Sequence, residues 1–162
     1  MLWRAWDDVR ANRGAPGVDG VTIEHVEASG VAAFLADLAA HVQAGTYRPA
    51  PLRRVDVPKP GQAGKFRPLS IPTVRDRVVM TAAKLVLEPV FEADFLPSSY
   101  GFRPKRSAEQ ANEAIRHEAN RGANWVVDAD VRDCFGSIDH DALMAQVARR
   151  VSDRRLLKLL RA

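Results

Sequence analysis

The clearest pattern along the chain is an apolar stripe at helical spacing between residues 29 and 45. Its members recur three and four positions apart, as one face of an amphipathic helix requires. They are Val31, Phe34, Leu35, Leu38 and Val42. Ser29 is expected to cap this helix at its start, and Gly45 is expected to end it.

The pattern changes to alternation in the stretch PLRRVDVPKPGQAGKFRPLSIP, residues 51–72. Apolar and polar residues alternate on either side of a turn rich in proline and glycine, which predicts a β-hairpin. We expect its arms near residues 52–57 and 65–71. The prolines at 58, 60 and 68 favour exposed edges, because proline donates no hydrogen bond to a ladder.

Two helices are predicted in the middle of the chain. From residue 75 to about 95 the apolar residues are dense enough for a largely buried helix, which Pro89 is expected to kink or end. Ser107 and Gln110 form a capping box that opens a second helix, ending near residue 120.

The remaining elements are shorter. The run NWVVDAD, residues 124–130, predicts a strand, Asp139 is expected to cap a helix to about residue 150, and a final helix is expected from Ser152. Segments 12–24 and 96–107 are rich in turn formers and are expected to be loops. The strand has no partner, and one strand is not a sheet. The order of elements therefore predicts a mixed α/β (α+β) fold that is incomplete.

Positive charge is concentrated in one central segment. The net charge is +4, and residues 46–80 carry eight basic residues against two acidic ones. Such a segment indicates a polyanionic ligand, either nucleic acid or a triphosphate. A solvated basic surface is the alternative.

Length and composition exclude several classes of protein. At 162 residues the chain is one domain or part of a larger one. No apolar run reaches the roughly 18 residues that span a bilayer, and the N-terminus lacks the apolar segment of a secretory signal. Cys134 is the only cysteine, and a single cysteine excludes a disulfide framework and a thiolate zinc site. Its side chain is expected to be buried. A cytoplasmic protein without a membrane partner is expected.

Asp128 and Asp130 stand two positions apart at the end of the predicted strand, so both side chains are expected on one face. Carboxylates beside a backbone carbonyl suit a hard cation such as Mg²⁺. Two such ions can activate a 3′-hydroxyl and stabilise the leaving group in nucleotidyl transfer. The alternative is a helix cap with surface ion pairs, since Asp-x-Asp is a common pattern.

Four blocks of sequence, in order, resemble the reverse transcriptases encoded by group II introns. DVRDCFGSIDH resembles their A motif, GAPGVDGVT their N-terminal block, PKPGQAGKFRPLSIPTVRDRVV their fingers block and SSYGFRPKRSAEQA the block that follows. Together the blocks cover most of residues 12–142. GVDG and YGFRP favour the group II lineage, while a CRISPR-associated or retron-type enzyme remains an alternative.

The resemblance implies a right-hand polymerase fold, with fingers over about residues 1–123 and the start of the palm over about 124–162. Asp130 falls where the family has its first catalytic metal ligand. The backbone carbonyl of Val131 falls where the family completes the second of two Mg²⁺ sites. Phe135 falls at the steric gate, whose bulk excludes a 2′-hydroxyl and so selects deoxynucleotides.

The hairpin is implied to bind the incoming nucleotide. Arg67 matches the arginine that clamps the triphosphate, a role that suits its planar, bidentate guanidinium. Lys59 is the candidate for a second clamp residue, and Lys65 is the alternative. The length of the turn leaves open which of the two lysines aligns with the family's residue.

Other residues are implied to bind the template. Arg103, Lys105 and Arg106 would contact its phosphates without reading sequence. Gly17 and Gly20 belong to a region that grips the template, where glycine permits a close approach of the backbone.

Four nearby side chains are expected to play supporting roles. Tyr100 and Phe102 are expected to hold their loop together rather than stack on bases. Asp19 is expected to make a local turn bond. Asp128 is not implied as a ligand, and it either tunes Asp130 by like-charge repulsion or pairs with an arginine.

The family carries two further aspartates in a Tyr/Phe-x-Asp-Asp hairpin, and no such tetrapeptide occurs here. Residues 1–162 alone are therefore expected not to polymerise DNA. The complete enzyme would use RNA as its template, chiefly the RNA of its own intron. It would extend a DNA or RNA primer with deoxynucleotides. The alternatives are a non-catalytic, maturase-like RNA-binding remnant and an interaction domain. An unfinished palm is expected to expose apolar surface around Val126 and Val127.

Overall fold

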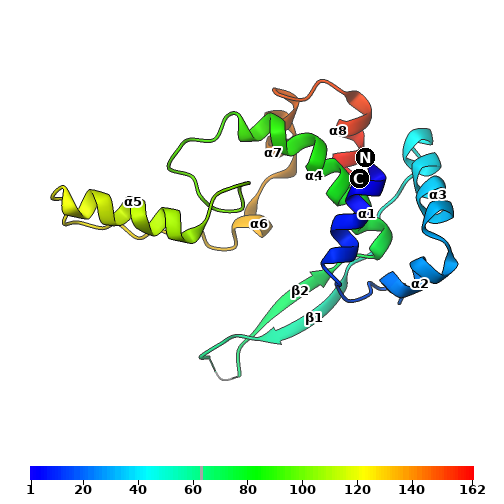
Figure 1. Cartoon of the computed structure of the whole chain (residues 1–162), viewed down its shortest axis with the longest axis horizontal. Helices are drawn as coiled ribbons and strands as arrows, with labels where there is room; N and C mark the ends of the chain where they lie inside the picture. Colours follow the sequence, from blue (N-terminus) through cyan, green and yellow to red (C-terminus); the bar gives the residue numbers. More distant parts are fainter. Residues whose placement is uncertain (63) are drawn as a thin grey trace. The chain divides into compact units, whose positions relative to one another are not determined.

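The computed structural model describes residues 1–62 and 64–162. The chain divides into two compact units, one of residues 1–87 with 151–162 and one of residues 88–150. Among the described residues the only sheet is a two-stranded hairpin, and the other elements are helices (Figure 1). The fold class is therefore α+β, as the sequence predicts.

The first unit contains the hairpin and the helices before and after it. Its elements are α1 (Leu2–Ala11), α2 (Ile23–Ser29), α3 (Val31–Ala44), β1 (Arg53–Pro58), β2 (Phe66–Ile71), the first part of α4 (Val74–Glu92) and α8 (Arg154–Leu160). The predicted hairpin is confirmed, and Gly45 ends α3 in a left-handed conformation with φ of 67°. Pro89 lies inside α4 and does not end it.

Two expectations about helix starts need correction, and one further helix is present. Ser29 does not cap α3, because it is the last residue of α2, and Gly30 takes the N-cap position. The helix α8 begins at Arg154 rather than at Ser152, and Asp153 caps it by accepting from the N–H groups of Arg155 and Leu156. The helix α1 lies where no helix is predicted above, although its buried residues Ala5, Trp6 and Val9 stand at helical spacing.

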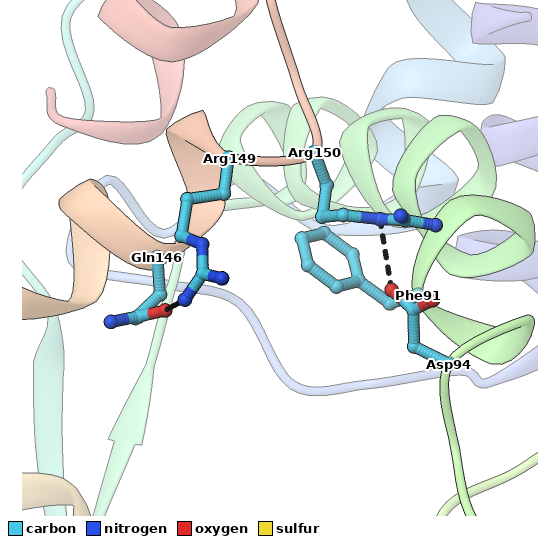
Figure 2. Close-up of a pocket in the computed structure, with 5 residues that line it drawn as sticks. All are labelled: Phe91, Asp94, Gln146, Arg149 and Arg150. Atoms are coloured by element: carbon cyan, nitrogen blue, oxygen red, sulfur yellow. Dashed lines mark hydrogen bonds and ion pairs between the residues drawn. The ribbon is translucent and has the colours of Figure 1, made fainter.

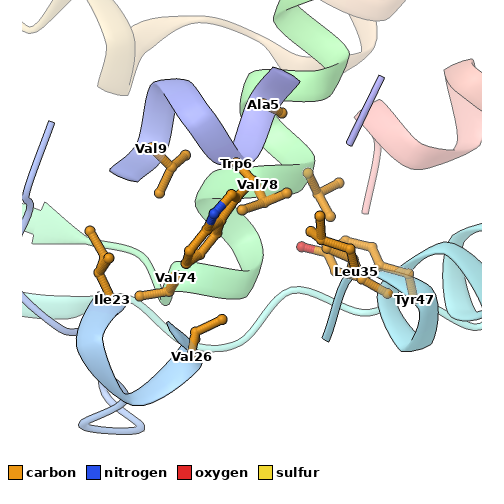
Figure 3. Packing of buried hydrophobic residues seen from close by; sticks show 11 residues of the cluster. Ala5, Trp6, Val9, Ile23, Val26, Leu35, Tyr47, Val74 and Val78 are labelled. Atoms are coloured by element: carbon orange, nitrogen blue, oxygen red, sulfur yellow. The ribbon is translucent and has the colours of Figure 1, made fainter. Parts of the chain in front are cut away.

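The core of the first unit gathers around Trp6 (Figure 3). Side chains from α1, α2, α3 and α4 are buried together there, and Leu159 of α8 packs against them. The Trp6 and Phe34 rings lie 6.0 Å apart between centroids, at an interplanar angle of 60°. The remaining buried apolar residues of this cluster are Ala5, Val9, Ile23, Val26, Leu35, Leu38, Tyr47, Val74, Val78 and Val79.

A buried carboxylate joins α4 to the segment that follows α3. Asp76 is 3% exposed, and its oxygens accept hydrogen bonds from the hydroxyls of Tyr47 (2.5 Å) and Thr73 (2.7 Å) and from the N–H of Ala50 (3.1 Å). The Asp76 N–H donates in turn to Thr73 Oγ1 at 3.1 Å, which caps α4. Burial and the neighbouring carboxylate raise the pKa of Tyr47, so its hydroxyl remains a donor.

The second unit relies on local contacts. Its helices, besides the end of α4, are α5 (Ala108–Asn120), α6 (Cys134–Ser137) and α7 (His140–Ala148). The predicted capping box is confirmed, because Ser107 Oγ accepts from the Gln110 N–H and Gln110 Oε1 accepts from the Ser107 N–H. Asp139 caps α7, as predicted, by accepting from the Ala142 N–H at 2.7 Å. No apolar residue between 88 and 150 is buried.

The predicted strand over residues 124–130 is wrong. A strand needs a neighbour that satisfies its N–H and C=O groups, and no other described segment pairs with this one. The prediction of exposed apolar surface here is confirmed, since Val126 and Val127 are 84% and 91% exposed and Trp125 is equally open. Cys134 is also exposed, so the expectation that it is buried is wrong.

Candidate nucleotide and nucleic-acid site

The register of the hairpin brings Lys59, Lys65 and Arg67 onto one face. Facing residues of an antiparallel pair point to the same side, and successive pairs alternate. Arg67 pairs with Val57, and a 2.9 Å hydrogen bond from the Lys59 N–H to the Lys65 carbonyl extends the ladder past the Pro58–Phe66 pair. By this alternation Lys59, Lys65 and Arg67 share a face. The two lysines that the sequence offers as alternative clamp residues are therefore neighbours in the hairpin.

The opposite face of the hairpin differs in charge. Arg54 and Asp56 lie there, and Arg54 Nε is 3.2 Å from the Asp56 carboxylate. By contrast, no described residue forms an ion pair with Lys59, Lys65 or Arg67, and all three are exposed. Unpaired cations on one face attract an anion with several charges, such as a triphosphate or a nucleic-acid backbone.

The glycine loop that begins at Gly14 is fixed to its own unit. A Cβ on Gly17 would lie 2.7 Å from the backbone N and Cα of Thr73, so the close approach at this glycine is to the start of α4. The Arg77 guanidinium donates to the Ala15 carbonyl at 2.8 Å, and burial lowers the pKa of Arg77. The structure thus explains Gly17 by internal packing.

Further along the same loop the backbone turns. Gly20 has φ of 69° and faces open space, as a left-handed turn position requires. The expected turn bond of Asp19 is confirmed, because its Oδ1 accepts from the Val21 N–H at 3.2 Å. The role of Gly17 and Gly20 toward a template stays a prediction.

In the second unit, Arg103 is the centre of the loop between α4 and α5. Its side chain is 7% exposed and donates to both oxygens of Glu92, and also to the carbonyls of Leu96 (2.7 Å) and Ser99 (2.8 Å). The guanidinium also lies 5.0 Å from the centroid of the Phe95 ring. The Glu92 carboxylate raises the pKa of Arg103, and the guanidinium lowers that of Glu92. These contacts engage the guanidinium of Arg103 within the loop.

Four other residues of this loop differ in their exposure. Arg106 lies over the Tyr100 ring, 5.3 Å from its centroid, so Tyr100 contributes to the loop as predicted. Phe102 is fully exposed and does not hold the loop together, which corrects that expectation. Lys105 has a left-handed backbone with φ of 59° and is exposed. Lys105 and Arg106 make no ion pair with any described residue.

The acidic segment of the second unit is open. Asp128 and Asp130 are exposed, as are Val131 and Phe135, the latter at 89%. No group of three or more histidine, cysteine or carboxylate side chains comes close enough to hold a metal ion within the described residues. Carboxylate and carbonyl oxygens of this kind suit a hard cation.

A hollow of about 470 Å³ lies at the ends of α4 and α7 within the second unit (Figure 2). Arg150 Nε is 2.9 Å from the Asp94 carboxylate, and the Arg149 guanidinium donates to Gln146 at 3.0 Å. Phe91 completes its lining. No motif indicates this hollow, because its two walls are about fifty residues apart in the sequence.

No helix in the part of the chain that the structure describes is long and apolar enough to cross a membrane. The family described as reverse transcriptase (RNA-dependent DNA polymerase) matches residues 57–160.

Several curated proteins are similar to this chain. Protein YkfC of Escherichia coli is 41% identical over 150 residues, which cover 90% of this chain and 38% of YkfC. The group II intron-encoded protein LtrA of Lactococcus lactis is 38% identical over 116 residues, which cover 72% of this chain and 19% of LtrA. A putative COX1/OXI3 intron 1 protein of Saccharomyces cerevisiae is 30% identical over 166 residues, all of this chain and 19% of that protein. The chain thus spans 38% or less of the length of these relatives.

Proposed function

The chain belongs to the reverse transcriptase (RNA-dependent DNA polymerase) family, in its group II intron-encoded type, and we propose from this premise that it binds nucleotide and template for an enzyme that copies RNA into DNA. The observation that carries the proposal is the basic face of the hairpin. Lys59, Lys65 and Arg67 share that face and have no carboxylate partner among the described residues. A triphosphate is the small anion whose charge matches such a group.

Each of these three residues has a role in the proposal. Arg67 grips phosphate oxygens through its bidentate guanidinium, while the lysines add two point charges beside it. Both lysines take part, because the register puts them side by side on one face.

The proposed catalytic residues lie in the open acidic segment. The family uses divalent metal ions, and we propose Mg²⁺ as the ion, with Asp130 and the Val131 carbonyl as the oxygen ligands that this chain contributes. Phe135 would exclude the ribose 2′-hydroxyl by its bulk. Because the described carboxylates form no cluster, residues 1–162 by themselves are expected not to extend a primer.

The proposed partners are an RNA template, in the first place the intron's own RNA, a DNA or RNA primer and deoxynucleoside triphosphates. Lys105 and Arg106 are the better candidates for phosphate contacts in the second unit, because the Arg103 guanidinium is engaged by Glu92 and two carbonyls. Gly17 and Gly20 are proposed to support the template through the backbone of their loop. The boundary between fingers and palm near residue 123 remains part of the proposal.

A second candidate function is a maturase-like RNA-binding remnant without catalysis. The exposure of Asp130, and the lack of a carboxylate cluster around it, favour this candidate. It predicts RNA binding that weakens steeply with salt, and no selective binding of a triphosphate.

The test is equilibrium binding of a deoxynucleoside triphosphate to residues 1–162, with two matched variants. Arg67→Ala removes one charge-assisted phosphate contact and is expected to weaken binding about tenfold. Arg54→Ala removes an arginine from the opposite face, where Asp56 already neutralises it, and is expected to change binding less than twofold. Equal losses in the two variants, or no triphosphate binding by the unmodified chain, would contradict the proposed nucleotide clamp.

A further inference from the structure

Phe102 has two features that are each unusual for a bulky aromatic residue. Its side chain is fully exposed, and its backbone has φ of 54° in the left-handed region. A bulky aromatic residue seldom adopts this region, since its Cβ approaches the backbone too closely. Strained positions of this kind cluster at binding sites and persist only where the surrounding structure fixes them.

The neighbouring residue supplies that fixation. The Arg103 guanidinium is held by Glu92 and by the carbonyls of Leu96 and Ser99, so the residue after Phe102 is tied to the end of α4 and to the start of its own loop. Lys105, three residues after Phe102, is also left-handed, with φ of 59°. The loop therefore presents the Phe102 ring outward on a firm support.

The surroundings of the ring indicate what it contacts. Glu92 pairs with Arg103, whereas neither Lys105 nor Arg106 forms an ion pair with a carboxylate among the described residues. An exposed aromatic ring beside two basic side chains suits a single-stranded nucleic acid, whose bases stack on aromatic rings while its phosphates contact basic side chains. A protein partner of opposite charge would match the cations but gives no reason for a ring on a strained backbone.

We propose that the ring of Phe102 stacks on an unpaired base of the RNA template, with Lys105 and Arg106 contacting the flanking phosphates. This inference rests on the proposed function, because it names one contact between this chain and its RNA. It gives the exposed ring of Phe102 a role in base stacking, which neither the sequence motifs nor the packing of the loop indicates.

The experiment measures binding of residues 1–162 to a short single-stranded oligoadenylate and to an oligomer of the same length built from abasic ribose phosphates. Phe102→Asn removes the ring but keeps a residue that tolerates the left-handed backbone, and Phe102→Tyr keeps a ring. Leu96→Ala is the matched control, because it also removes an exposed apolar side chain from this loop.

Loss of one stacked base is expected to weaken binding of the oligoadenylate to Phe102→Asn by about five- to 100-fold. Binding of the abasic oligomer is expected to remain unchanged, because the cations are intact. Phe102→Tyr should restore affinity, and Leu96→Ala should bind like the unmodified chain. The melting temperature of Phe102→Asn should not fall, since the exposed ring supports no packing.

Two results would overturn the inference. If the unmodified chain binds the oligoadenylate and Phe102→Asn binds it equally well, or loses affinity for both oligomers alike, base stacking at Phe102 is wrong while RNA binding stands. If the unmodified chain binds neither oligomer, the proposed RNA-binding function fails and this inference fails with it.

Discussion

The two units of this chain keep their structure by different means. The first unit has an apolar core around Trp6 and a buried carboxylate, Asp76, that accepts from three donors. In the second unit no apolar residue is buried, and its structure depends on helix caps and ion pairs such as Arg103–Glu92. The first unit should therefore depend strongly on a few buried positions, whereas the second leaves most of its side chains available to ligands.

The largest expected effect tests the buried carboxylate of the first unit. Asp76→Ala leaves the donors of Tyr47, Thr73 and Ala50 without an acceptor, and each unsatisfied buried donor costs on the order of 1–3 kcal/mol. We expect the free energy of unfolding, measured by urea denaturation, to fall by roughly 3–5 kcal/mol. The exposed Asp56→Ala is the control and should change it by less than about 0.5 kcal/mol. Equal effects would remove the distinction between buried and exposed carboxylates.

A smaller loss is expected at Gly17. The added Cβ of Gly17→Ala would meet the Thr73 backbone at 2.7 Å, so the loop or α4 must shift. Overpacking of this kind typically costs about 1–3 kcal/mol in urea denaturation. Gly101→Ala is the control, because nothing lies within 4 Å of a Cβ there and its φ is not left-handed. A neutral Gly17→Ala variant would mean that the loop is not packed on α4 in solution.

In the second unit, acid should loosen the Arg103 loop. The guanidinium holds the pKa of Glu92 below its ordinary value of 4.5, so the stabilisation is complete above that pH and is lost as pH falls through the lowered pKa. Hydrogen exchange of the loop amides should therefore show protection at neutral pH that disappears in acid. Glu92→Gln should abolish this dependence. Protection that persisted unchanged at low pH would show that the ion pair does not hold the loop.

The smallest effect is expected in the open acidic segment. Val127→Ala removes a side chain that is 91% exposed and should change the free energy of unfolding by less than about 0.5 kcal/mol. The same truncation at the fully buried Val78 should cost roughly 2–3 kcal/mol, through lost burial and a cavity. If both variants lose stability alike, residues around Val127 pack against the protein in solution.

Local signals in the sequence predict the local structure well. The hairpin arms, the Ser107–Gln110 capping box and the Asp139 cap are present, because each depends on neighbouring residues alone. The helix α1 could have been predicted from its spaced apolar residues. The strand over residues 124–130 could not be judged locally, since an apolar run becomes a strand only where another segment pairs with it.

The candidate site was predictable to a different degree in each part. The motifs identify the hairpin cations, but the register is needed to put both lysines on the face of Arg67. The hydrogen bonds of Arg103 are made to Glu92, eleven residues away, and to two backbone carbonyls. The positions of those carbonyls cannot be predicted from the pattern of side chains. The exposure of Phe102 likewise follows from the path of the loop and not from its composition.

The hairpin has a consequence for self-association. A two-stranded ribbon leaves the outer N–H and C=O groups of both strands free, which makes each strand a template for pairing with another copy of the chain. Pro58 and Pro68 remove donors from these rims, and like charges on Lys59, Lys65 and Arg67 repel a second ribbon. The cations proposed to bind phosphate are therefore also expected to oppose pairing between ribbons, and neutralising them should weaken this protection as well as the binding of a ligand.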